Sequence, residues 1–422
     1  MKLDIKKIMI SLLLIAFPLG GAVAQELNDY LRIAAENNPE LQSAYTNFEA
    51  ALQQSPQVAS LPDPTLTVSA FGRMVETRLG AQEARFSFMQ MFPWFGTLKT
   101  KRDAADLLAE ARFQEYLAKR ANLFFEIKKA YAELFAIDKT ILLKEKNLDI
   151  LDSYRELSLS KFRSGSSKMV NVVRVDIEQD AALTEIAIEQ EQLESLKKRF
   201  NLLLNRDKEA TVAIQDTLVF DAELRKGMIN TEEAFNMHPE LTKFDREREA
   251  YENRAKTAQK SGLPNIGIGL DYAIISERMD ANPPGNGQDA IMPMVSVTLP
   301  IFRKKYKAAE REAELMQEAA IKNKEARKNQ LQSELEATLY DLTKTNKLLR
   351  LYERQLESSA QANKLLVSAF SNDNGDFEEV LEMNQDILIL KIQQIEALKT
   401  GFTAEAKMEY LSAKTQNYDE TK

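Results

Sequence analysis

The chain has 422 residues, more than one ordinary globular core needs, with no cysteine and a single histidine, His238. This composition excludes disulfides, thiolate catalysis, cysteine-ligated metals, a lipid-modified cysteine and any site built from two histidines. The formal net charge is −8 and no basic block stands out, so nucleic acid is not an expected partner. No cofactor is expected, and no nucleophile–base pair, phosphate-binding loop or metal-ligand cluster indicates an enzyme.

Residues 1–24 are typical of a cleaved secretory signal peptide. Lysines precede an apolar run, Ile8–Leu19, and the small residues Ala22 and Ala24 stand where signal peptidase needs them, before Gln25. The alternative, a membrane anchor, needs a longer apolar run than this one. We therefore expect an exported protein that begins at Gln25.

Two very long helices are predicted by the distribution of glycine and proline, the residues that interrupt helices. Neither residue occurs in Leu98–Arg163 or in Arg303–Ser371. At 1.5 Å per residue, each stretch extends roughly 100 Å as a helix. Ile127, Leu134 and Ile141 are seven residues apart, which predicts coiled-coil packing along the first rod.

Each rod ends near a glycine and is followed by a second helical stretch, which predicts two helical hairpins. Gly165 interrupts the first rod and Gly375 the second. The hairpin tips are expected at Arg163–Lys168 and Ser371–Asp376.

Four windows alternate apolar and polar residues with period two, which predicts strands with one apolar face. These windows are Thr65–Arg73, Arg85–Phe92, Asn265–Ile274 and Ile291–Leu299. In the second window, Phe86 and Phe88 alternate with Ser87. Polar turns are expected around Val75–Glu83 and Glu277–Ala290.

The chain is a tandem repeat, because short motifs return in the same order at an offset that grows slowly from 200 to 210 residues. Pro39-Glu40-Leu41 returns as Pro239-Glu240-Leu241, Pro93-Trp94-Phe95 as Pro300-Ile301-Phe302, and Gly165 as Gly375. The first repeat is predicted at 25–230, with strands at about 64–74 and 84–92 and a hairpin at about 97–205. The second is predicted at 231–422, with strands at about 264–275 and 291–299 and a hairpin at about 302–415.

Four strands with one apolar face cannot close a barrel alone, because two edges would stay unpaired. Three copies would supply twelve strands, within the range of outer-membrane barrels. The predicted fold class is therefore mainly α with membrane β: a trimeric, 12-stranded β-barrel continued by an α-helical barrel, which the resemblance described next places in the periplasm.

The order of these motifs resembles the TolC family of outer-membrane efflux proteins. The resemblance lies in Asn37–Leu41, Leu61–Pro64, Pro93–Lys99, Leu299–Phe302 and the tip glycines, and covers essentially the whole chain after the signal. Within the family, Pro62-Asp63-Pro64 with Pro93-Trp94-Phe95-Gly96 resembles most the heavy-metal branch of the CusC/CzcC type. Many members of that branch carry a lipid on an N-terminal cysteine, which this chain lacks.

The resemblance implies a homotrimeric exit duct in the Gram-negative outer membrane, in contact with its lipid and extending into the periplasm. It implies two protein partners, a periplasmic adaptor (membrane fusion) protein and an inner-membrane pump of the RND type. Such a duct exports small solutes passively, and heavy-metal cations are among the cargoes that the branch implies. The alternative is a periplasmic adaptor or structural coiled-coil protein, which would share the hairpins but would not need four amphipathic strands.

The hairpin tips hold the predicted adaptor-docking residues, Gly165, Ser166, Asn374 and Gly375, although a plain turn would need the same glycines. Near the second tip, Asp373 and Asp376 would form two rings of carboxylates in a trimer and act as a cation-attracting gate. Arg163 and Arg174 are candidate partners that could hold the tips closed. The alternative is a solvated turn whose aspartates cap the next helix.

Four methionines alternate with the apolar strand residues and are expected on the opposite, lumen-facing side. These candidate soft-metal ligands are Met89, Met91, Met292 and Met294. The alternative is adaptable packing in a narrowing pore. Trp94 and Phe95 follow the second strand and predict an interfacial aromatic belt, with a ligand site as the alternative. His238, before a helix start, is expected to be a cap or a surface residue.

Overall fold

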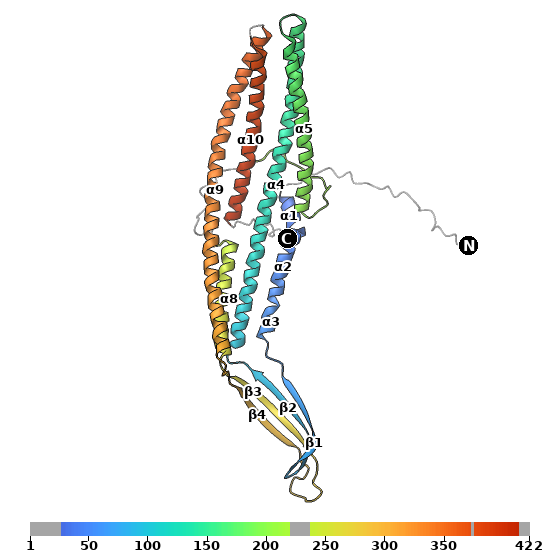
Figure 1. Ribbon diagram of the computed structural model, residues 1–422, viewed down its shortest axis with the longest axis vertical. Helices are drawn as coiled ribbons and strands as arrows, with labels where there is room; N and C mark the ends of the chain where they lie inside the picture. The colour runs from blue at the N-terminus through green and yellow to red at the C-terminus, as the bar shows by residue number, and fades with distance from the viewer. Residues whose placement is uncertain (1–26, 220–236, 373–374, 413–422) are drawn as a thin grey trace, which may run out of the picture.

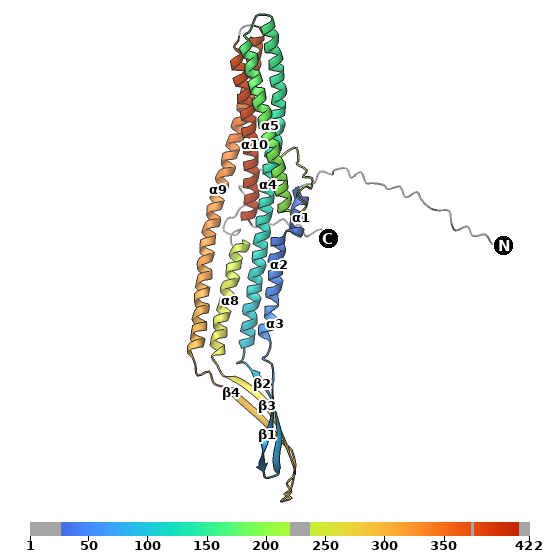
Figure 2. The same cartoon turned by 45° about the vertical axis from the view of Figure 1, so that its right-hand side comes forward.

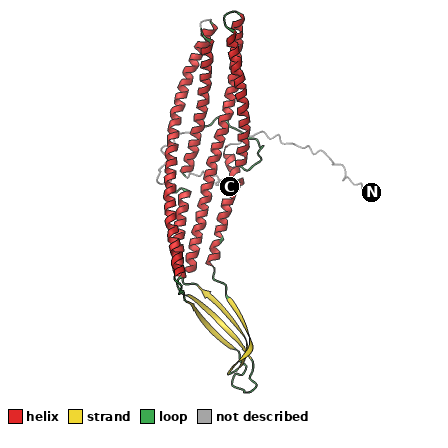
Figure 3. Cartoon of the chain, viewed as in Figure 1, coloured by secondary structure: helices red, strands yellow, loops and turns green. Residues whose placement is uncertain are grey.

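A computed structural model describes residues 27–219, 237–372 and 375–412. The expected signal peptide, residues 1–24, lies outside the described residues. The molecule is elongated, with a β-sheet at one end and long helices that rise from the sheet to two tips at the other end (Figures 1 and 3).

The length of the molecule is set by two helices, α4 (Thr97–Arg163, 67 residues) and α9 (Lys304–Ser371, 68 residues). Neither contains proline or glycine, so no residue type that breaks a helix interrupts them. From the tips, α5 (Met169–Leu203) and α10 (Phe377–Leu411) return to the middle of the molecule.

Shorter helices complete the part nearer the sheet. They are α1 (Leu27–Asn37), α2 (Pro39–Leu52), α3 (Gln54–Ala59) and α8 (Pro239–Ser261). In the half near the tips, the helices lie side by side in the order α5, α4, α10, α9. In the half near the sheet, the order is α2 and α3, then α4, α8 and α9 (Figures 1 and 2). The helical layer therefore has two open edges, one formed by α5, α2 and α3 and the other by α9.

The sheet has four antiparallel strands in the order β1 (Thr65–Thr77), β2 (Gly80–Phe92), β3 (Asn265–Ile275) and β4 (Ala290–Thr298). The described chain pairs β2 with β3, so the second strand of the first repeat meets the first strand of the second repeat at the centre. The outer edges of β1 and β4 lack a partner strand within the described residues. These two edges continue the two open edges of the helical layer.

The polar loop predicted at 75–83 is wrong, because the strands continue to a tight turn at Arg78-Leu79. The hydroxyl of Thr77 donates to the carbonyl of Gly80 (2.7 Å) and accepts from the amide of Leu79 (3.3 Å). Gly80 has φ +133°, a conformation that other residues rarely adopt. The backbone conformation of one glycine therefore makes this segment a tight turn between two strands, although its composition is polar.

The two repeats begin α2 and α8 in the same way. A proline stands at the first helical position, and the preceding side chain accepts a hydrogen bond from a first-turn amide: Asn38 from Leu41 (3.1 Å) and His238 from Glu240 (3.3 Å). His238 is thus a cap, as expected, but it is only 1% exposed. The expectation of a surface position is wrong, because Tyr410 of α10 packs edge-on against the imidazole ring.

Three apolar clusters hold the layer together. Two lie at mid-height: one around Tyr30, Tyr131 and Phe200, and the other around Leu241, Leu331 and Met408. The third lies near the tips and joins both hairpins: its members are Leu151, Tyr154, Val175, Phe370, Phe377 and Val380. Packing, rather than helix propensity alone, therefore positions the tips relative to each other.

Candidate functional site

One face of the sheet is apolar and exposed. In the strand register, Leu66 lies opposite Phe88, Phe88 opposite Leu270, and Ile268 opposite Val295. The exposed large apolar side chains of this face are Leu66, Val68, Phe86, Phe88, Ile268, Leu270, Tyr272, Ile291, Val295 and Val297. A continuous apolar surface of this kind marks a contact with lipid or with another apolar surface.

The opposite face of the sheet is polar, because side chains alternate along a strand. In the register, Thr67 lies opposite Ser87 and Ser87 opposite Asp271. Asp271 is fully buried and forms an ion pair with Arg85 from β2. A charged pair on this face and aliphatic and aromatic side chains on the other give the sheet two chemically distinct sides.

All four predicted methionines lie on the polar face, since Met89 pairs in register with Gly269, Gly269 with Met294, and Met292 with Asp271. The sulfurs of Met89 and Met91 fill the space over Gly267, where a Cβ atom would stand only 3.0 and 2.6 Å from them. Met292, by contrast, is 40% exposed. Met89 and Met91 thus pack against glycines, the alternative that the sequence left open.

The hairpin tips lie where the glycines predicted them, at the end of the molecule far from the sheet (Figure 1). Gly165 has φ +78° and Ser166 is exposed beside it. At Gly375, an added Cβ would lie 2.8 Å from the backbone nitrogen of Phe370. Each glycine is therefore required by the backbone of its turn, for a different reason.

The predicted gate residues are placed as follows. Asp376 caps α10, since its carboxylate accepts from the amide of Glu378 (3.0 Å), and Arg163 is exposed at the first tip. Arg174 forms an ion pair with Glu378 (2.7 Å) rather than with Asp376. Asp373 and Asn374 lie outside the described residues.

Polar contacts between the two hairpins reinforce the apolar cluster near the tips. The ammonium group of Lys161 donates to the carbonyl of Ser371 (2.6 Å), and the amide of Asn363 donates to the hydroxyl of Tyr154 (3.2 Å). With Arg174 and Glu378, these contacts connect α4 to α9 and α5 to α10. Any movement that separates the hairpins of one chain must break them.

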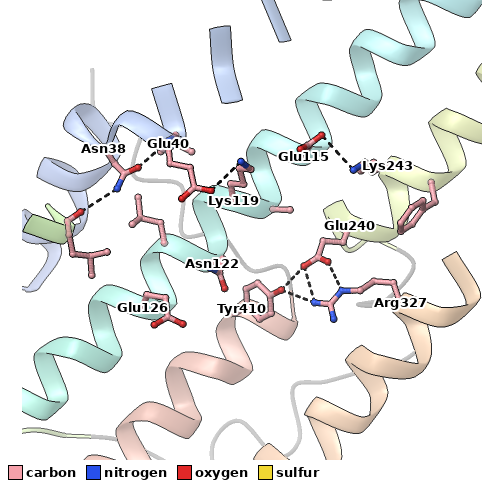
Figure 4. A pocket seen from close by; sticks show the side chains of 15 residues that line it. Asn38, Glu40, Glu115, Lys119, Asn122, Glu126, Glu240, Lys243, Arg327 and Tyr410 are labelled. Atoms are coloured by element: carbon pink, nitrogen blue, oxygen red, sulfur yellow. Dashed lines mark hydrogen bonds and ion pairs between the residues drawn. The ribbon is translucent and has the colours of Figure 1, made fainter. Parts of the chain in front are cut away.

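At mid-height, a half-buried polar network joins α8, α9 and α10 (Figure 4). The guanidinium of Arg327 donates to Glu240 (3.0 Å) and to Glu334 (2.9 Å). The hydroxyl of Tyr410 donates to Glu240 (2.5 Å), and Lys407 pairs with Glu334 (2.7 Å). The side chains of Arg327 and Glu240 are 19% and 25% exposed, so water screens this network only in part.

The pKa values of this network show which ionisation states the fold favours. Burial alone would raise the pKa of the Glu240 carboxyl, but hydrogen bonds from Arg327 and Tyr410 outweigh it, so the pKa is lowered. The pKa of Tyr410 is raised by burial and by its hydrogen bond to Glu240. Glu240 is therefore a carboxylate and Tyr410 a neutral phenol at neutral pH.

The network borders a cavity of about 470 Å³ between α2, α4, α8, α9 and α10. On the other side of this cavity, Lys119 pairs with Glu40 (3.1 Å), which is the same arrangement in the first repeat. Glu40 corresponds to Glu240, and Lys119 to Arg327 at an offset of 208 residues. The sequence analysis missed the network, although the repeat offset was a signal that could have found it.

We expect the stability of the protein to depend on pH through His238. Burial lowers the pKa of this imidazole. Since the unfolded chain binds a proton at about pH 6.5 and the folded chain only at lower pH, stability falls as the pH falls below about 6.5. The substitution His238→Asn copies the cap residue of the first repeat, Asn38, and removes this titration.

The thermal unfolding temperature of the His238→Asn variant should therefore vary less than that of the native chain between about pH 7 and pH 5. Circular dichroism at the helical bands measures it. Equal pH slopes in the two proteins would contradict the assignment, since the chain has no other histidine.

Among the described residues, no helix carries an apolar stretch of bilayer-spanning length. In the same part of the chain, no three histidine, aspartate or glutamate side chains are grouped to hold a metal ion.

Comparison with known proteins shows which known fold this architecture resembles. Residues 30–205 match the model of the family described as outer membrane efflux protein. No curated protein sequence matches the chain at a significant level. Among solved structures, the chain is similar to the outer-membrane channel OprN, with a TM-score of 0.76, 18% identity, and coverage of 92% of this chain and 89% of OprN.

Two further structures give the same result. The outer membrane protein VceC of Vibrio cholerae has a TM-score of 0.73 and 17% identity over 92% of this chain and 96% of VceC. CusC has a TM-score of 0.77 and 15% identity over 92% of each chain. The described chain has the mainly helical fold, with a small antiparallel sheet, of the outer-membrane efflux channels, and its residues 30–205 match the outer membrane efflux protein family.

Proposed function

We propose that the protein is the outer-membrane channel of a tripartite efflux system, a passive exit duct that an inner-membrane RND-type pump drives through a periplasmic adaptor. One observation carries the proposal: the exposed apolar face of the sheet is continuous across strands of both repeats, and the sheet joins a helical layer of roughly 100 Å. The sheet is the part that enters the outer membrane, and the helices extend into the periplasm after removal of the signal peptide.

A homotrimer follows from the edges of the chain. In an antiparallel four-stranded sheet, the outer edge strands run in opposite directions, so β4 of one copy can pair antiparallel with β1 of the next. The same head-to-tail contact brings α9 of one copy against α5, α2 and α3 of the next. Repetition around an axis then closes a ring, and three copies supply the twelve strands of a barrel that leaves no edge in lipid.

The outer faces of α5 and α9 support this contact. Val173, Ile177 and Ile188 lie on the side of α5 opposite its buried residues and are 45–62% exposed. On α9, Tyr340 and Leu365 lie opposite the buried residues and are 65% and 72% exposed. Apolar side chains that stay in water in one chain become buried when the next copy packs against it.

The trimer can be tested with cysteines, because the chain has none of its own. Ile177 and Leu365 stand at similar distances from their tip glycines but on opposite edges of the layer, so Ile177→Cys with Leu365→Cys should cross-link between copies. The cross-linked ladder in detergent should end at three copies. Either single variant is the control, and a monomer inserted in a membrane would refute the proposal.

The alternative, a periplasmic adaptor or structural coiled-coil protein, shares the hairpins only. It gives no role to a sheet whose exposed face carries Phe86, Phe88 and Leu270. The functional experiment is export in a strain that lacks the gene. Complementation should restore resistance to the pump's substrates, and purified protein should form ion-conducting pores in a planar bilayer.

We keep heavy-metal cations as the proposed cargo, on the support of the methionines on the polar face of the sheet, of which Met292 is 40% exposed. In the complementation experiment, resistance to copper and silver should exceed resistance to organic drugs. Loss of drug resistance alone in the deletion strain would remove the heavy-metal assignment and leave the channel.

We propose that Asp373 and Asp376 form the gate of the channel. In the trimer, each would supply one ring of carboxylates where the second tips meet around the axis. Because Asp376 also caps α10, the substitution to test is Asp376→Asn, which keeps the cap and removes the charge. With Asp373→Asn, it should reduce cation selectivity and weaken block by divalent cations in single-channel recordings. Asp341→Asn, on α9 away from the tip, is the control, and unchanged selectivity and block would place the gate elsewhere.

Adaptor docking at the tips, through Gly165, Ser166, Asn374 and Gly375, is part of the same proposal. Its support is that the described tip residues Gly165, Ser166 and Gly375 are exposed and lie at the end of the molecule farthest from the sheet.

A further inference from the structure

Between the sheet and the helices, both repeats expose large apolar side chains. Phe95 is 77% exposed, Ile301 72% and Phe302 78%, and these residues stand directly after β2 and β4. Leu61 and Leu299 extend the same belt, which we call the junction belt, with 46% and 67% exposure. The belt continues the apolar face of the sheet towards the helices, so the surface that contacts lipid in the proposed channel reaches as far as this junction.

Basic residues follow the junction belt at once. Residues 97–102 contain three of them and no acidic residue, and residues 303–307 contain four and no acidic residue. They are Lys99, Lys101, Arg102, Arg303, Lys304, Lys305 and Lys307. This basic band contrasts with the whole chain, whose net charge is −8.

The fold itself leaves much of this positive charge without a counter-charge. Lys99, Arg102, Lys304 and Lys307 are exposed, and none of them has an acidic partner within the described residues. Helix stability does not explain the band either, because cations are unfavourable near the start of a helix, where α4 and α9 both carry them. An anionic surface outside the chain would remove this cost.

We propose that the junction belt and the basic band dock on the periplasmic leaflet of the outer membrane, with the belt at the boundary between acyl chains and headgroups and the band on anionic phospholipid headgroups. The inference rests on the proposed channel function and deepens it, since it names the lipid that the chain selects. Two observations select lipid as the occupant: the apolar belt is continuous with the apolar face of the sheet, and the positive band complements phosphate. Basic residues next to a membrane surface attract anionic lipid in this way.

The chain carries its own reporter for this contact. Trp94 is its only tryptophan, and its ring lies 6.0 Å from the ring of Phe95 in the junction belt. Full-length protein is reconstituted into vesicles of phosphatidylcholine with phosphatidylglycerol, in which one lipid or the other carries bromine, a quencher of tryptophan fluorescence. Bromine placed near the headgroup should quench Trp94 most. At low salt, the ratio of quenching by the two brominated lipids should show a preference for phosphatidylglycerol over phosphatidylcholine of about fivefold, the effect of one near-surface basic residue.

The variant that tests the basic band is Lys304→Gln with Lys305→Gln and Lys307→Gln. Its preference for phosphatidylglycerol should fall to about 2.5-fold, since four of the seven basic residues of the band remain and contribute in proportion. The matched control removes three lysines farther along the same helix, with Lys344→Gln, Lys347→Gln and Lys364→Gln, and should keep the native preference. All six positions are exposed, so the substitutions leave the packed core unchanged.

Each outcome supports or overturns a defined claim. Equal quenching by both lipids in the native protein, an unchanged preference in the band variant, or a loss of preference in the control variant would overturn the inference while the channel stands. Pores that conduct while neither lipid quenches Trp94 would also overturn it, and would indicate that a neighbouring copy covers the belt. The absence of both quenching and conductance would refute the proposed function itself.

Discussion

Replacement of Arg327 by alanine should destabilise the protein by about 3 kcal/mol, because it removes the one cation that two half-buried carboxylates, Glu240 and Glu334, share. Arg327 donates to Glu240 and Glu334 from a side chain that is only 19% exposed. Tyr410 and Lys407 would remain as partners, one for each carboxylate, so the loss should be large but not complete. Chemical denaturation of the protein in detergent, followed by helical circular dichroism, measures the change.

The first repeat supplies the matched control. Lys119 occupies the position of Arg327 and pairs with Glu40, but the two side chains are 39% and 75% exposed. Lys119→Ala should therefore cost only about 0–1 kcal/mol. Arg327→Lys should fall between the two, since one ammonium group cannot replace a planar guanidinium that spans two carboxylates. Equal losses in Arg327→Ala and Lys119→Ala would show that the network contributes nothing beyond a surface pair.

Replacement of both tip glycines by proline, Gly165→Pro with Gly375→Pro, should reduce export to the level of a strain without the gene. Proline cannot adopt the φ of +78° at Gly165, and it removes the amide that donates to the carbonyl of Phe162 (3.0 Å). At Gly375, ring atoms would meet the backbone of Phe370. The turns must therefore change shape, and an adaptor that docks on them loses its surface.

The trimer and the pore should survive this double substitution, because the sheet and the mid-height clusters lie far from the tips (Figure 1). Gel mobility of the undissociated trimer and pore conductance test that part. Ser164→Ala changes an exposed side chain of the same tip without changing its backbone and should export normally. Normal export by the proline variant would show that the tips are turns only.

Local sequence patterns were sufficient to predict most of the helices and strands. The absence of glycine and proline from α4 and α9 leaves the chain no place to turn, and the period-two alternation assigns Phe86 and Met89 to opposite sides of the sheet. The prediction of a loop at 75–83 was wrong because the polar composition of this segment says nothing about the contacts of Gly80 with the next strand. At this glycine, an added Cβ would lie 1.6 Å from the carbonyl oxygen of Ser276.

The sequence by itself determined the rods, the strands and the tip glycines, because each depends on local backbone preference or on periodicity along one segment. Only the tertiary structure decided which charged residues meet. Arg327 and Tyr410 are 83 residues apart, and Arg174 pairs with Glu378 rather than with Asp376. Such pairs depend on the order of the helices α5, α4, α10 and α9 and on how far each side chain reaches, and no short-range pattern encodes either.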